Sequence, residues 1–438
     1  DCFGRCRSIA MRLLALVTLV ITCLCGAAVG IAPPARRACI GMQSKQSPPT
    51  RSSGGLRVLE WTPSQQLLVR SAKLIWNTLW RTMLGELAPQ SPEGDYVRPA
   101  AQLGSTSPDG GWAPEWPIAR ERYHLYIGNA CPWCHRVLAT LSVLGLLDGA
   151  VTFSRMVDDP SKASRGGWCF DDASELSRDP VFGAFDLREV YNRCSPGGSY
   201  TGRCTAPLMI DKERGAIVSN ESGDIVRMLN FIAPALRRGA GGEPGGGSGR
   251  EGVDLFPEAL RADIIEANRW IYEDVNNGVY KCGFCTTQEA YCRAESALHK
   301  ALKRLDAHFA AGNEFVCGAQ LTEADIRLLP TISRFDGVYA NIFRCGRLLI
   351  RADYPAINDW LLRMLAVVGD GQGPLYHTVD LDAARHSYYT NLFPLNPGGL
   401  VPLGPTATEL GWQVTHSSLD ALIARNSDVN SEEPIASR

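Results

Sequence analysis

The segment GNACPWCHRVLATLSVLGLL, residues 128–147, constrains the fold of this chain more than any other segment does. Cys131 and Cys134 stand at the start of an apolar helical pattern, and Pro132 lies between them. Proline is tolerated in the first turn of a helix, where its missing N–H group would be unpaired anyway. A helix N-terminus carries partial positive charge and free N–H groups, and both favour a thiolate. The pattern therefore predicts a nucleophilic Cys131 at a helix start, with Cys134 as the resolving thiol one turn further along.

Two other interpretations of this cysteine pair stay open, a zinc half-site and an inert structural disulfide. Zinc would require two further ligands, and the only other pair with the same spacing is Cys282 and Cys285, in a later part of the chain. The fifteen cysteines do not follow the short, regular framework of a secreted disulfide scaffold. The sequence therefore favours a reduced compartment, reactive thiol chemistry and no metal.

Short predicted elements on both sides of the pair suggest an α/β domain. Their order is strand, helix, strand, helix, strand, strand, helix. The corresponding segments are 123–128, 132–147, 151–157, 186–194, 206–211, 216–219 and 221–232. This order is that of a thioredoxin-like sheet, which does not determine a function on its own.

A glycine-rich stretch separates this domain from a second region in which helical periodicity dominates. Thr322, with Asp325 three residues later, predicts a capping box at the start of one of these helices. The expected organisation is a targeting presequence at 1–59, an N-terminal extension at 60–117, a thioredoxin-like domain at 118–236, a linker at 237–252, an all-helical domain at 253–405 and a disordered tail at 406–438.

The N-terminal region has the composition of a targeting sequence. From Met11, one positive charge precedes an apolar run that ends in small residues at 26–28. The next stretch is rich in Arg, Ser and Pro, and no Asp or Glu occurs between Met11 and Leu59. Such a two-part presequence is typical of delivery to a plastid with additional membranes, and we expect the mature protein to have no stable membrane association. A secretory signal and a single anchor helix are the alternatives.

Two features beyond the cysteine pair suit a glutathione site. Pro207 begins the third predicted strand, where thioredoxin-like glutathione proteins carry a cis proline, although a strand-edge proline would look the same. Glu221 and Ser222 open the last helix of the domain, where N–H groups can bind a carboxylate and Glu221 can hold an ammonium. A simple helix cap is the alternative for these two residues. The net charge of −2 gives no reason to expect a nucleic-acid partner.

Longer motifs run in order along the chain from about residue 112 to 405. They are ACPWCHR (130–136), GGWCF (166–170), NESGDIVRM (220–228), NNGVYKCGF (276–284), QEAY (288–291), LTEADIRL (321–328), RFDGVY (334–339), DYP (353–355), HSYY (386–389) and NPGGLVPLGP (396–405). With these motifs the sequence resembles the glutathionyl-hydroquinone reductases, an omega-like group also called Xi-class glutathione transferases.

The resemblance implies a thioredoxin-like domain followed by an all-helical one, usually in a homodimer, with glutathione as co-substrate. It also implies that Cys131 attacks the sulfur of a glutathionyl-hydroquinone, releases the hydroquinone and forms a mixed disulfide, which a second glutathione resolves to glutathione disulfide. Tyr280, Tyr339 and Tyr388 match tyrosines of the aromatic-substrate pocket, with Tyr280 and Tyr388 as catalytic candidates, although core or interface packing would also explain them. Glutathione-binding positions match Trp168, Arg203, Ala206, Pro207, Glu221 and Ser222.

The sequence departs from the family pattern at three positions. The family usually has alanine where Cys134 and Cys285 stand, and valine where Ala206 stands. A true Cys-x-x-Cys pair could resolve the mixed disulfide internally, so a dithiol glutaredoxin or a dehydroascorbate reductase is an alternative. A carrier of glutathione conjugates without catalysis is a third hypothesis, but such a protein would need no activated thiol.

Overall fold

The computed structural model describes residues 64–104, 107, 110–128, 130–171, 178–237, 253–369, 373–392 and 395–412. The chain divides into two compact units, Asp1–Val69 and Arg70–Arg438. The first unit is described only from residue 64, next to the start of helix α2 (Gln65–Leu87), and everything below concerns the second unit. The predicted presequence at 1–59 and nearly all of the predicted linker lie outside the described residues.

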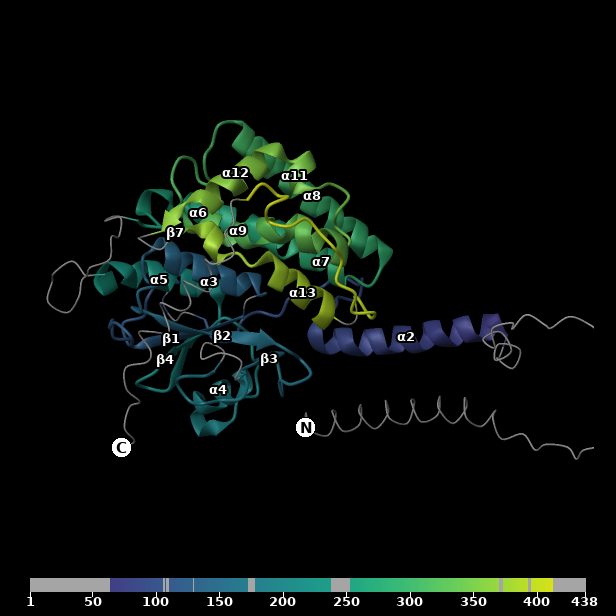
Figure 1. Ribbon diagram of the computed structural model, residues 1–438, viewed down its shortest axis with the longest axis horizontal. Coiled ribbons are helices and arrows are strands. Elements are labelled where there is room, and N and C mark those ends of the chain that lie inside the picture. The colour runs from purple at the N-terminus through teal and green to yellow at the C-terminus, as the bar shows by residue number, and fades with distance from the viewer. Residues whose placement is uncertain are drawn as a thin grey trace, which may run out of the picture. The chain divides into compact units, whose positions relative to one another are not determined.

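A five-stranded mixed sheet forms the first domain, with its strands in the order β3-β2-β1-β4-β5. β1 and β2 are parallel, whereas β4 pairs antiparallel with β1, β5 with β4 and β3 with β2. Helices α3 and α5 cover one face of the sheet and α4 lies on the other (Figure 1). This arrangement confirms the predicted thioredoxin-like domain. Its elements are β1 (Tyr123–Gly128), α3 (Pro132–Val143), β2 (Thr152–Asp158), β3 (Trp168–Cys169), α4 (Leu187–Arg193), the 3-10 turn η3 (Pro196–Gly198), β4 (Leu208–Asp211), β5 (Ala216–Ser219) and α5 (Ser222–Arg237).

The structure differs from the predicted elements in two places near the cysteine pair. Helix α3 ends at Val143 rather than at residue 147, because Gly145 has a φ of +68° and does not continue the right-handed helix. Strand β3 was not predicted, since two residues are too short to show an alternating pattern. Every residue of β1 is buried, as a central strand covered on both faces requires.

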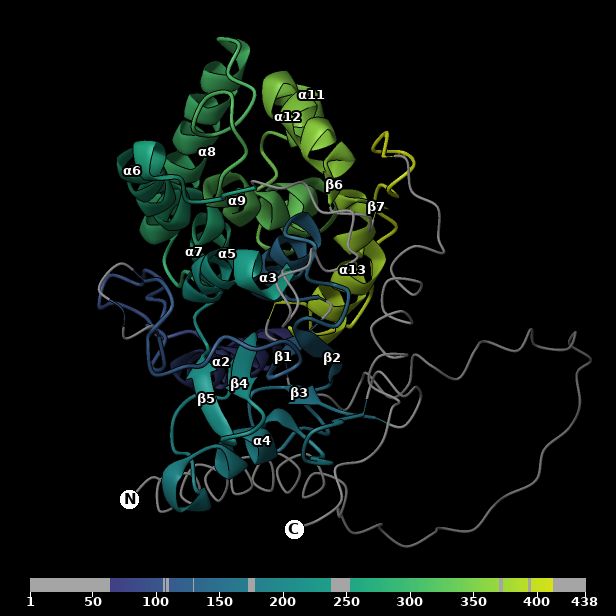
Figure 2. The same cartoon turned by 90° about the vertical axis from the view of Figure 1, so that its left-hand side faces the viewer.

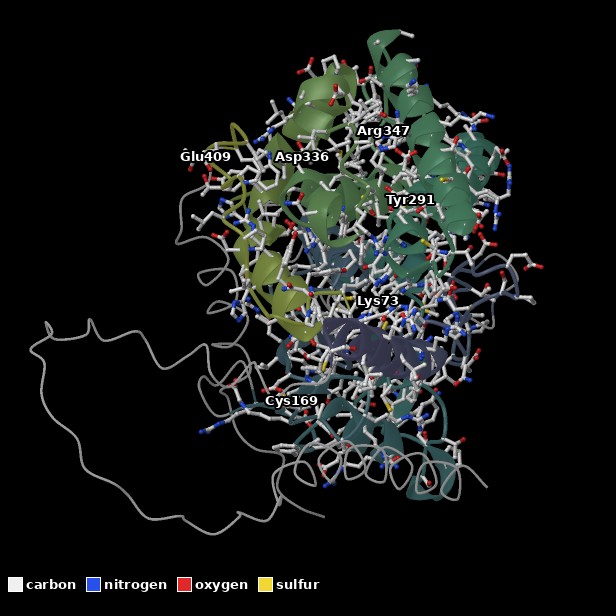
Figure 3. All side chains as sticks on the ribbon, turned by 90° about the vertical axis from the view of Figure 1, so that its right-hand side faces the viewer. Lys73, Cys169, Tyr291, Asp336, Arg347 and Glu409 are labelled. Carbon is white, nitrogen blue, oxygen red and sulfur yellow. The ribbon has the colours of Figure 1, made fainter. Side chains whose placement is uncertain are left out.

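The second domain is helical and packs on the side of the sheet that α3 and α5 cover (Figure 2). In Figure 3, Cys169 marks the sheet domain, whereas Tyr291, Asp336 and Arg347 mark the helical domain. Its elements are η4 (Glu258–Leu260), α6 (Arg261–Ile271), η5 (Tyr272–Asn276), α7 (Gly278–Phe284), α8 (Gln288–Ala310), α9 (Glu323–Arg334), η6 (Phe335–Tyr339), α10 (Ala340–Ile342), α11 (Ile350–Asp353), α12 (Pro355–Ala366), the two-residue strands β6 (Val368–Gly369) and β7 (Gly373–Pro374), η7 (Leu375–Thr378) and α13 (Leu381–Asn391).

The capping box predicted at the start of α9 is present. The Asp325 carboxylate accepts hydrogen bonds from the Thr322 backbone N–H at 3.1 Å and from the Thr322 hydroxyl at 3.2 Å. It also accepts from the Val316 backbone N–H at 2.8 Å and from the Trp360 indole N–H at 3.0 Å. Because Asp325 is fully buried, this carboxylate fixes both the start of α9 and its packing against α12.

Two further observations concern the C-terminal segment and the length and hydrophobicity of the helices. The segment 406–412, which the sequence assigns to the tail, forms a turn in which Trp412 is buried, and residues 413–438 lie outside the described part. Among the helices that the structure describes, none combines the length and the hydrophobicity that a membrane crossing requires.

Candidate active site

Cys131 occupies the position directly before α3, with φ −73° and ψ 119°. Its backbone N–H donates to the Gly128 carbonyl at 3.1 Å, and its own carbonyl accepts from the His135 N–H at 3.0 Å, which closes the first turn of the helix. The Cys131 thiol lies 3.7 Å from the Ala206 carbonyl oxygen. The side chain is 8% exposed, so the sulfur sits at the edge of the core next to the strand start at Pro207.

The two cysteines of the pair have opposite acidities. Burial alone raises the pKa of Cys131, but hydrogen bonds from the Cys134 thiol and from the backbone N–H groups of Cys134 and Trp133, together with the charge of Arg334, lower it overall. Burial and the neighbouring Cys131 raise the pKa of Cys134 well above its usual value. The Gly128 N–H donates to the Cys134 sulfur at 3.2 Å. The arrangement therefore favours a Cys131 thiolate beside a protonated Cys134.

Arg334, at the end of α9, is a fully buried cation near this thiol. One of its nitrogens, Nη1, lies 2.8 Å from His135 Nδ1 and 3.2 Å from the Pro330 carbonyl oxygen. Its Nε and Nη2 atoms have no hydrogen-bond partner, and it makes no ion pair with any residue in the described ranges. Burial and the charge of Arg334 lower the pKa of His135 well below its usual value, so His135 is neutral and accepts from the guanidinium. A buried cation without an anion is costly, and an ionised Cys131 would offset that cost.

An open pocket with a cavity volume of about 100 Å³ lies next to the start of α3. The Ala206–Pro207 peptide bond is cis, as predicted. Predicted glutathione-binding residues from distant parts of the chain meet in this pocket, namely Arg203, Ala206, Pro207, Glu221 and Ser222.

The start of α5 forms one wall of this pocket. The Glu221 carboxylate accepts from the Gly223 backbone N–H at 3.0 Å, and Ser222 is 3% exposed. Arg136 of α3 donates to the Ser222 hydroxyl at 3.5 Å, and its guanidinium lies 4.4 Å from the ring centre of Trp133. Burial, reinforced by the charge of nearby Arg327, lowers the pKa of Arg136 to about 9. The wall thus presents an acid, a hydroxyl and a helix N-terminus side by side, a set that suits a zwitterionic amino-acid group.

Trp168 lies elsewhere, on the edge strand β3. A Cβ atom added to Gly128 would come within 2.1 Å of the Trp168 ring, so the indole packs directly on the turn that leads to Cys131. Trp168 is not among the residues that line the pocket of Glu221 and Ser222. The structure therefore brings Trp168 to the turn that leads to Cys131, whereas the other predicted glutathione-binding residues line the pocket.

The three predicted tyrosines form one cluster in the helical domain. The hydroxyls of Tyr280 and Tyr388 are hydrogen-bonded to each other, and the Tyr339 hydroxyl lies 3.4 Å from that of Tyr388. Burial raises the pKa of all three hydroxyls, and most strongly those of Tyr280 and Tyr388. The Tyr280 ring stacks on Trp133 with 6.2 Å between ring centres, which connects the cluster to the helix of Cys131. These hydroxyls are protonated and can donate.

Sequence reasoning missed several residues of the site, above all Arg98 and Arg334. Arg98 belongs to the N-terminal extension and lines the same pocket as Glu221. Its guanidinium carbon lies 4.1 Å from the ring centre of Trp133 and 5.3 Å from that of Tyr280. It stands in a Pro- and Gly-rich stretch without a motif, so the only signal in the sequence was a cation in a segment of low complexity.

The thiols of the second cysteine pair, Cys282 and Cys285, are not acidified as that of Cys131 is. Burial raises the pKa of Cys282 to about 12 and also raises that of Cys285, so neither thiol is activated. Within the described ranges, no three His, Cys, Asp or Glu side chains form a group that could hold a metal ion.

Comparisons with known proteins agree with this geometry. Residues 288–363 match the family model of the glutathione S-transferase C-terminal domain. The chain is 36% identical over 331 residues to glutathionyl-hydroquinone reductase PcpF of Sphingobium chlorophenolicum, covering 76% of this chain and 94% of that protein. It resembles the crystal structure of the glutathione-S-transferase Xi from Phanerochaete chrysosporium with a TM-score of 0.62 and 34% identity, over 72% of this chain and 95% of that one.

A second solved structure is the glutathione-bound form of YqjG, a glutathione transferase homolog from Escherichia coli K-12. It matches with a TM-score of 0.59 and 35% identity over 73% of this chain and 96% of that one. Nearly the whole length of each relative is therefore matched at more than 30% identity. The acidified cysteine, the pocket beside it and these matches together show that the chain belongs to the glutathionyl-hydroquinone reductases, the Xi class of glutathione transferases.

Proposed function

We propose that this enzyme uses glutathione to reduce glutathionyl-hydroquinones, through a disulfide formed at Cys131. One conjugate and one glutathione give the free hydroquinone and glutathione disulfide. The carbon–sulfur bond of the conjugate is reduced to a carbon–hydrogen bond while two sulfurs are oxidised to a disulfide, so no further redox partner is needed. The observation that carries the proposal is the acidified Cys131 next to a cluster of protonated tyrosines.

In the first half of the reaction, the Cys131 thiolate attacks the sulfur of the conjugate. A sulfur–sulfur bond forms as the carbon–sulfur bond breaks, and the electron pair passes to the ring carbon. Tyr280 or Tyr388 donates a proton to that carbon, because burial keeps both hydroxyls protonated. The hydroquinone then leaves, and Cys131 carries glutathione as a mixed disulfide.

In the second half, the thiolate of another glutathione attacks the glutathionyl sulfur on Cys131. Glutathione disulfide leaves and the Cys131 thiolate returns. The proton that the incoming thiol loses replaces the one that the tyrosine gave, so protons and electrons balance over the cycle.

The pocket suits glutathione as co-substrate. Glu221 can hold the γ-glutamyl ammonium, and Ser222 with the first N–H groups of α5 can bind its carboxylate. The Ala206 backbone beside Pro207 lies against the Cys131 sulfur, where the cysteinyl part of glutathione has to be. Arg203 lines the same pocket and is a proposed contact of the tripeptide. Trp168, which packs on Gly128 in the turn before Cys131, is a second proposed contact.

Turnover of a glutathionyl-hydroquinone tests this function, with Cys131→Ser as the critical variant. We expect wild type to release hydroquinone and to show a glutathione adduct on Cys131 by mass spectrometry, and Cys131→Ser to do neither. Cys292→Ser, which changes the exposed thiol of α8, is the matched control and should behave as wild type. Full turnover by Cys131→Ser would refute the mechanism, and conjugate binding without any turnover by wild type would support the carrier hypothesis.

Reduction of disulfides by the dithiol pair is a second candidate function. It is favoured by the hydrogen bond between the Cys134 and Cys131 thiols, which places a resolving sulfur next to the mixed disulfide. A coupled assay with a glutathionylated peptide would detect this glutaredoxin-like activity, and dehydroascorbate in the same assay would detect the related reductase.

We also propose that the protein is a homodimer and that residues 1–59 direct it to a plastid. The family resemblance supports the dimer, and the acid-free composition between Met11 and Leu59 supports the presequence. Sedimentation equilibrium and N-terminal sequencing of the protein from its source cells measure the two properties. A monomer at micromolar concentration would contradict the first proposal, and an N-terminus at Met11 in a membrane fraction would contradict the second.

A further inference from the structure

Arg98 is a cation near the site that has no role in the reaction proposed above. It projects from the N-terminal extension into the pocket of Glu221 and Ser222. It also lines an adjoining pocket of about 460 Å³ between the extension and the helical domain. Its guanidinium rests 4.1 Å from the ring centre of Trp133 and 5.3 Å from that of Tyr280. Arg98 thus stands between the glutathione pocket, the helix of Cys131 and one of the tyrosines.

The Arg98 guanidinium lacks an anionic partner. Within the described ranges it makes neither an ion pair nor a hydrogen bond, and only the two aromatic rings contact its charge. A guanidinium stacked on aromatic rings keeps its N–H donors available, and it binds carboxylates and other oxyanions more strongly than it binds water. The side chain remains charged, because the nearby phenols and Cys131 raise its pKa despite the opposing effect of burial.

The segment that carries Arg98 is fixed to both domains. The Asn220 backbone N–H donates to the Leu103 carbonyl at 2.7 Å, and the Leu103 N–H donates to the Asn220 side chain at 3.2 Å. On the other side of Arg98, the Tyr96 ring packs on Phe284 with 5.6 Å between ring centres. The guanidinium is therefore held in place by contacts on either side of it in the chain, as a recognition residue requires.

We propose that Arg98 binds an anionic oxygen of the bound conjugate, either a carboxylate of its glutathione part or the ionised hydroxyl of its hydroquinone ring. This inference rests on the proposed function and specifies the substrate class as glutathione conjugates that present such an oxygen to Arg98. The carboxylate and the phenolate share one chemistry, an oxyanion that accepts from a guanidinium.

Three ligands separate the two sources. They are a glutathionyl-hydroquinone, its glycyl ethyl ester and S-phenylglutathione, which has no ring hydroxyl. Affinities are measured by calorimetry in the Cys131→Ser background, where no turnover occurs, and KM and kcat are measured with wild-type Cys131. The variants are Arg98→Met and Arg98→Lys. Arg304→Met is the matched control, because Arg304 also stacks 4.1 Å from a tryptophan ring centre, that of Trp270, outside this site.

We expect Arg98→Met to weaken binding of the hydroquinone conjugate about 10-fold or more, with Arg98→Lys retaining part of the affinity and Arg304→Met all of it. KM should rise more than kcat falls. If the glycyl carboxylate is the source, S-phenylglutathione also loses affinity and the ester becomes insensitive to the substitution. If the ring oxygen is the source, both the acid and the ester lose affinity and S-phenylglutathione does not. A loss with S-phenylglutathione and with the ester alike would point to the γ-glutamyl carboxylate.

Unchanged affinity for all three ligands in a folded Arg98→Met protein would overturn the proposal and leave Arg98 as a packing residue. Failure of the proposed function would give a different experimental result. In that case wild type does not turn over the conjugate, while the effect of Arg98→Met on binding in the Cys131→Ser background still decides the role of Arg98.

Discussion

At the scale of single residues, the charge of Arg334 adds to the hydrogen bonds from Cys134 and Trp133 in lowering the pKa of Cys131. The groups near the sulfur are the Cys134 thiol, the backbone N–H groups at the start of α3, the cations Arg98 and Arg334, and the buried tyrosines. Of the two cations, Arg334 is fully buried and lacks an anion among the described residues, so its charge is the less screened by water.

We predict that Arg334→Met raises the pKa of Cys131, because the thiolate loses a buried positive charge. Thiolate should then appear at higher pH than in wild type, and alkylation by iodoacetamide at neutral pH should slow about 10-fold or more. Arg334→Lys should restore most of the acidity, since it keeps the charge. The same alkylation profile in the methionine variant and in wild type, with an intact fold, would show that the helix N-terminus alone acidifies the thiol.

A second substitution tests the proposed proton donors separately from the nucleophile. Tyr388 contacts both other hydroxyls of the cluster, so we predict that Tyr388→Phe lowers kcat for hydroquinone release about 100-fold, within the usual range for loss of a general acid. Alkylation of Cys131 should be unchanged. Tyr291→Phe, which alters a hydroxyl bonded to the Arg344 carbonyl, is the control. A fall of alkylation in parallel with kcat would mean that the tyrosines act on the thiol instead.

At the scale of elements, the two thiols at the start of α3 differ in the importance that we expect for hydroquinone release. Cys134 is 1% exposed and its pKa is raised well above the usual value, so an external glutathione thiolate should resolve the mixed disulfide at least as well. We predict that Cys134→Ala changes hydroquinone release less than about threefold, under roughly 0.7 kcal/mol, and abolishes any reduction of protein disulfides. Equal loss of both activities would make Cys134 a catalytic partner.

Helix α9 begins at a carboxyl group that gives the helical domain a pH dependence. Burial raises the pKa of Asp325 to about 6, against an ordinary value of about 3.9 in the unfolded chain. Between these values the folded protein binds the proton and the unfolded chain does not, so the contribution of Asp325 to stability is full below about pH 4 and declines as pH rises through 6.

We therefore predict that Asp325→Asn is destabilising, by about 1–3 kcal/mol, because the amide NH2 group cannot accept a hydrogen bond from the surrounding donors, whereas both oxygens of the neutral carboxyl group can. The difference in free energy of unfolding between wild type and variant should be largest near pH 4 and should shrink towards pH 7. Urea denaturation across that range measures it. A difference that grows towards pH 7 would contradict the direction of the pKa shift.

At the scale of the whole molecule, every described residue that lines the site lies at or after Asp95. We predict that a chain without residues 1–59 keeps kcat/KM within about twofold of the full chain, since the residues that line the site all lie after this proposed presequence. Steady-state turnover of both forms checks this. A large loss on truncation would assign residues 1–59 a role in the folded enzyme.

Most of the fold could be predicted from the sequence, and each element was recognisable for its own physical reason. β1 was visible because a buried central strand is apolar throughout, and α9 because Thr322 and Asp325 form its cap. The end of α3 was misplaced, since apolar residues continue past Gly145 although the helix does not. For the site, Cys131, Glu221 and the tyrosines were accessible from motifs. Arg334 also stands in a motif, but nothing in a linear pattern reveals that an arginine is buried without an anion.

The division of the site between the two domains suggests how this enzyme could be recombined with its relatives. The sheet domain supplies the sulfur and most of the residues that we propose to bind the tripeptide, whereas the helical domain supplies Arg334 and the tyrosine hydroxyls. In a chimera with the helical domain of a related protein, affinity for glutathione should follow the donor of the first domain. Thiol acidity and the range of accepted leaving groups should follow the donor of the second. Natural exchange of the second half could then diversify the chemistry while the first half continues to select the same peptide.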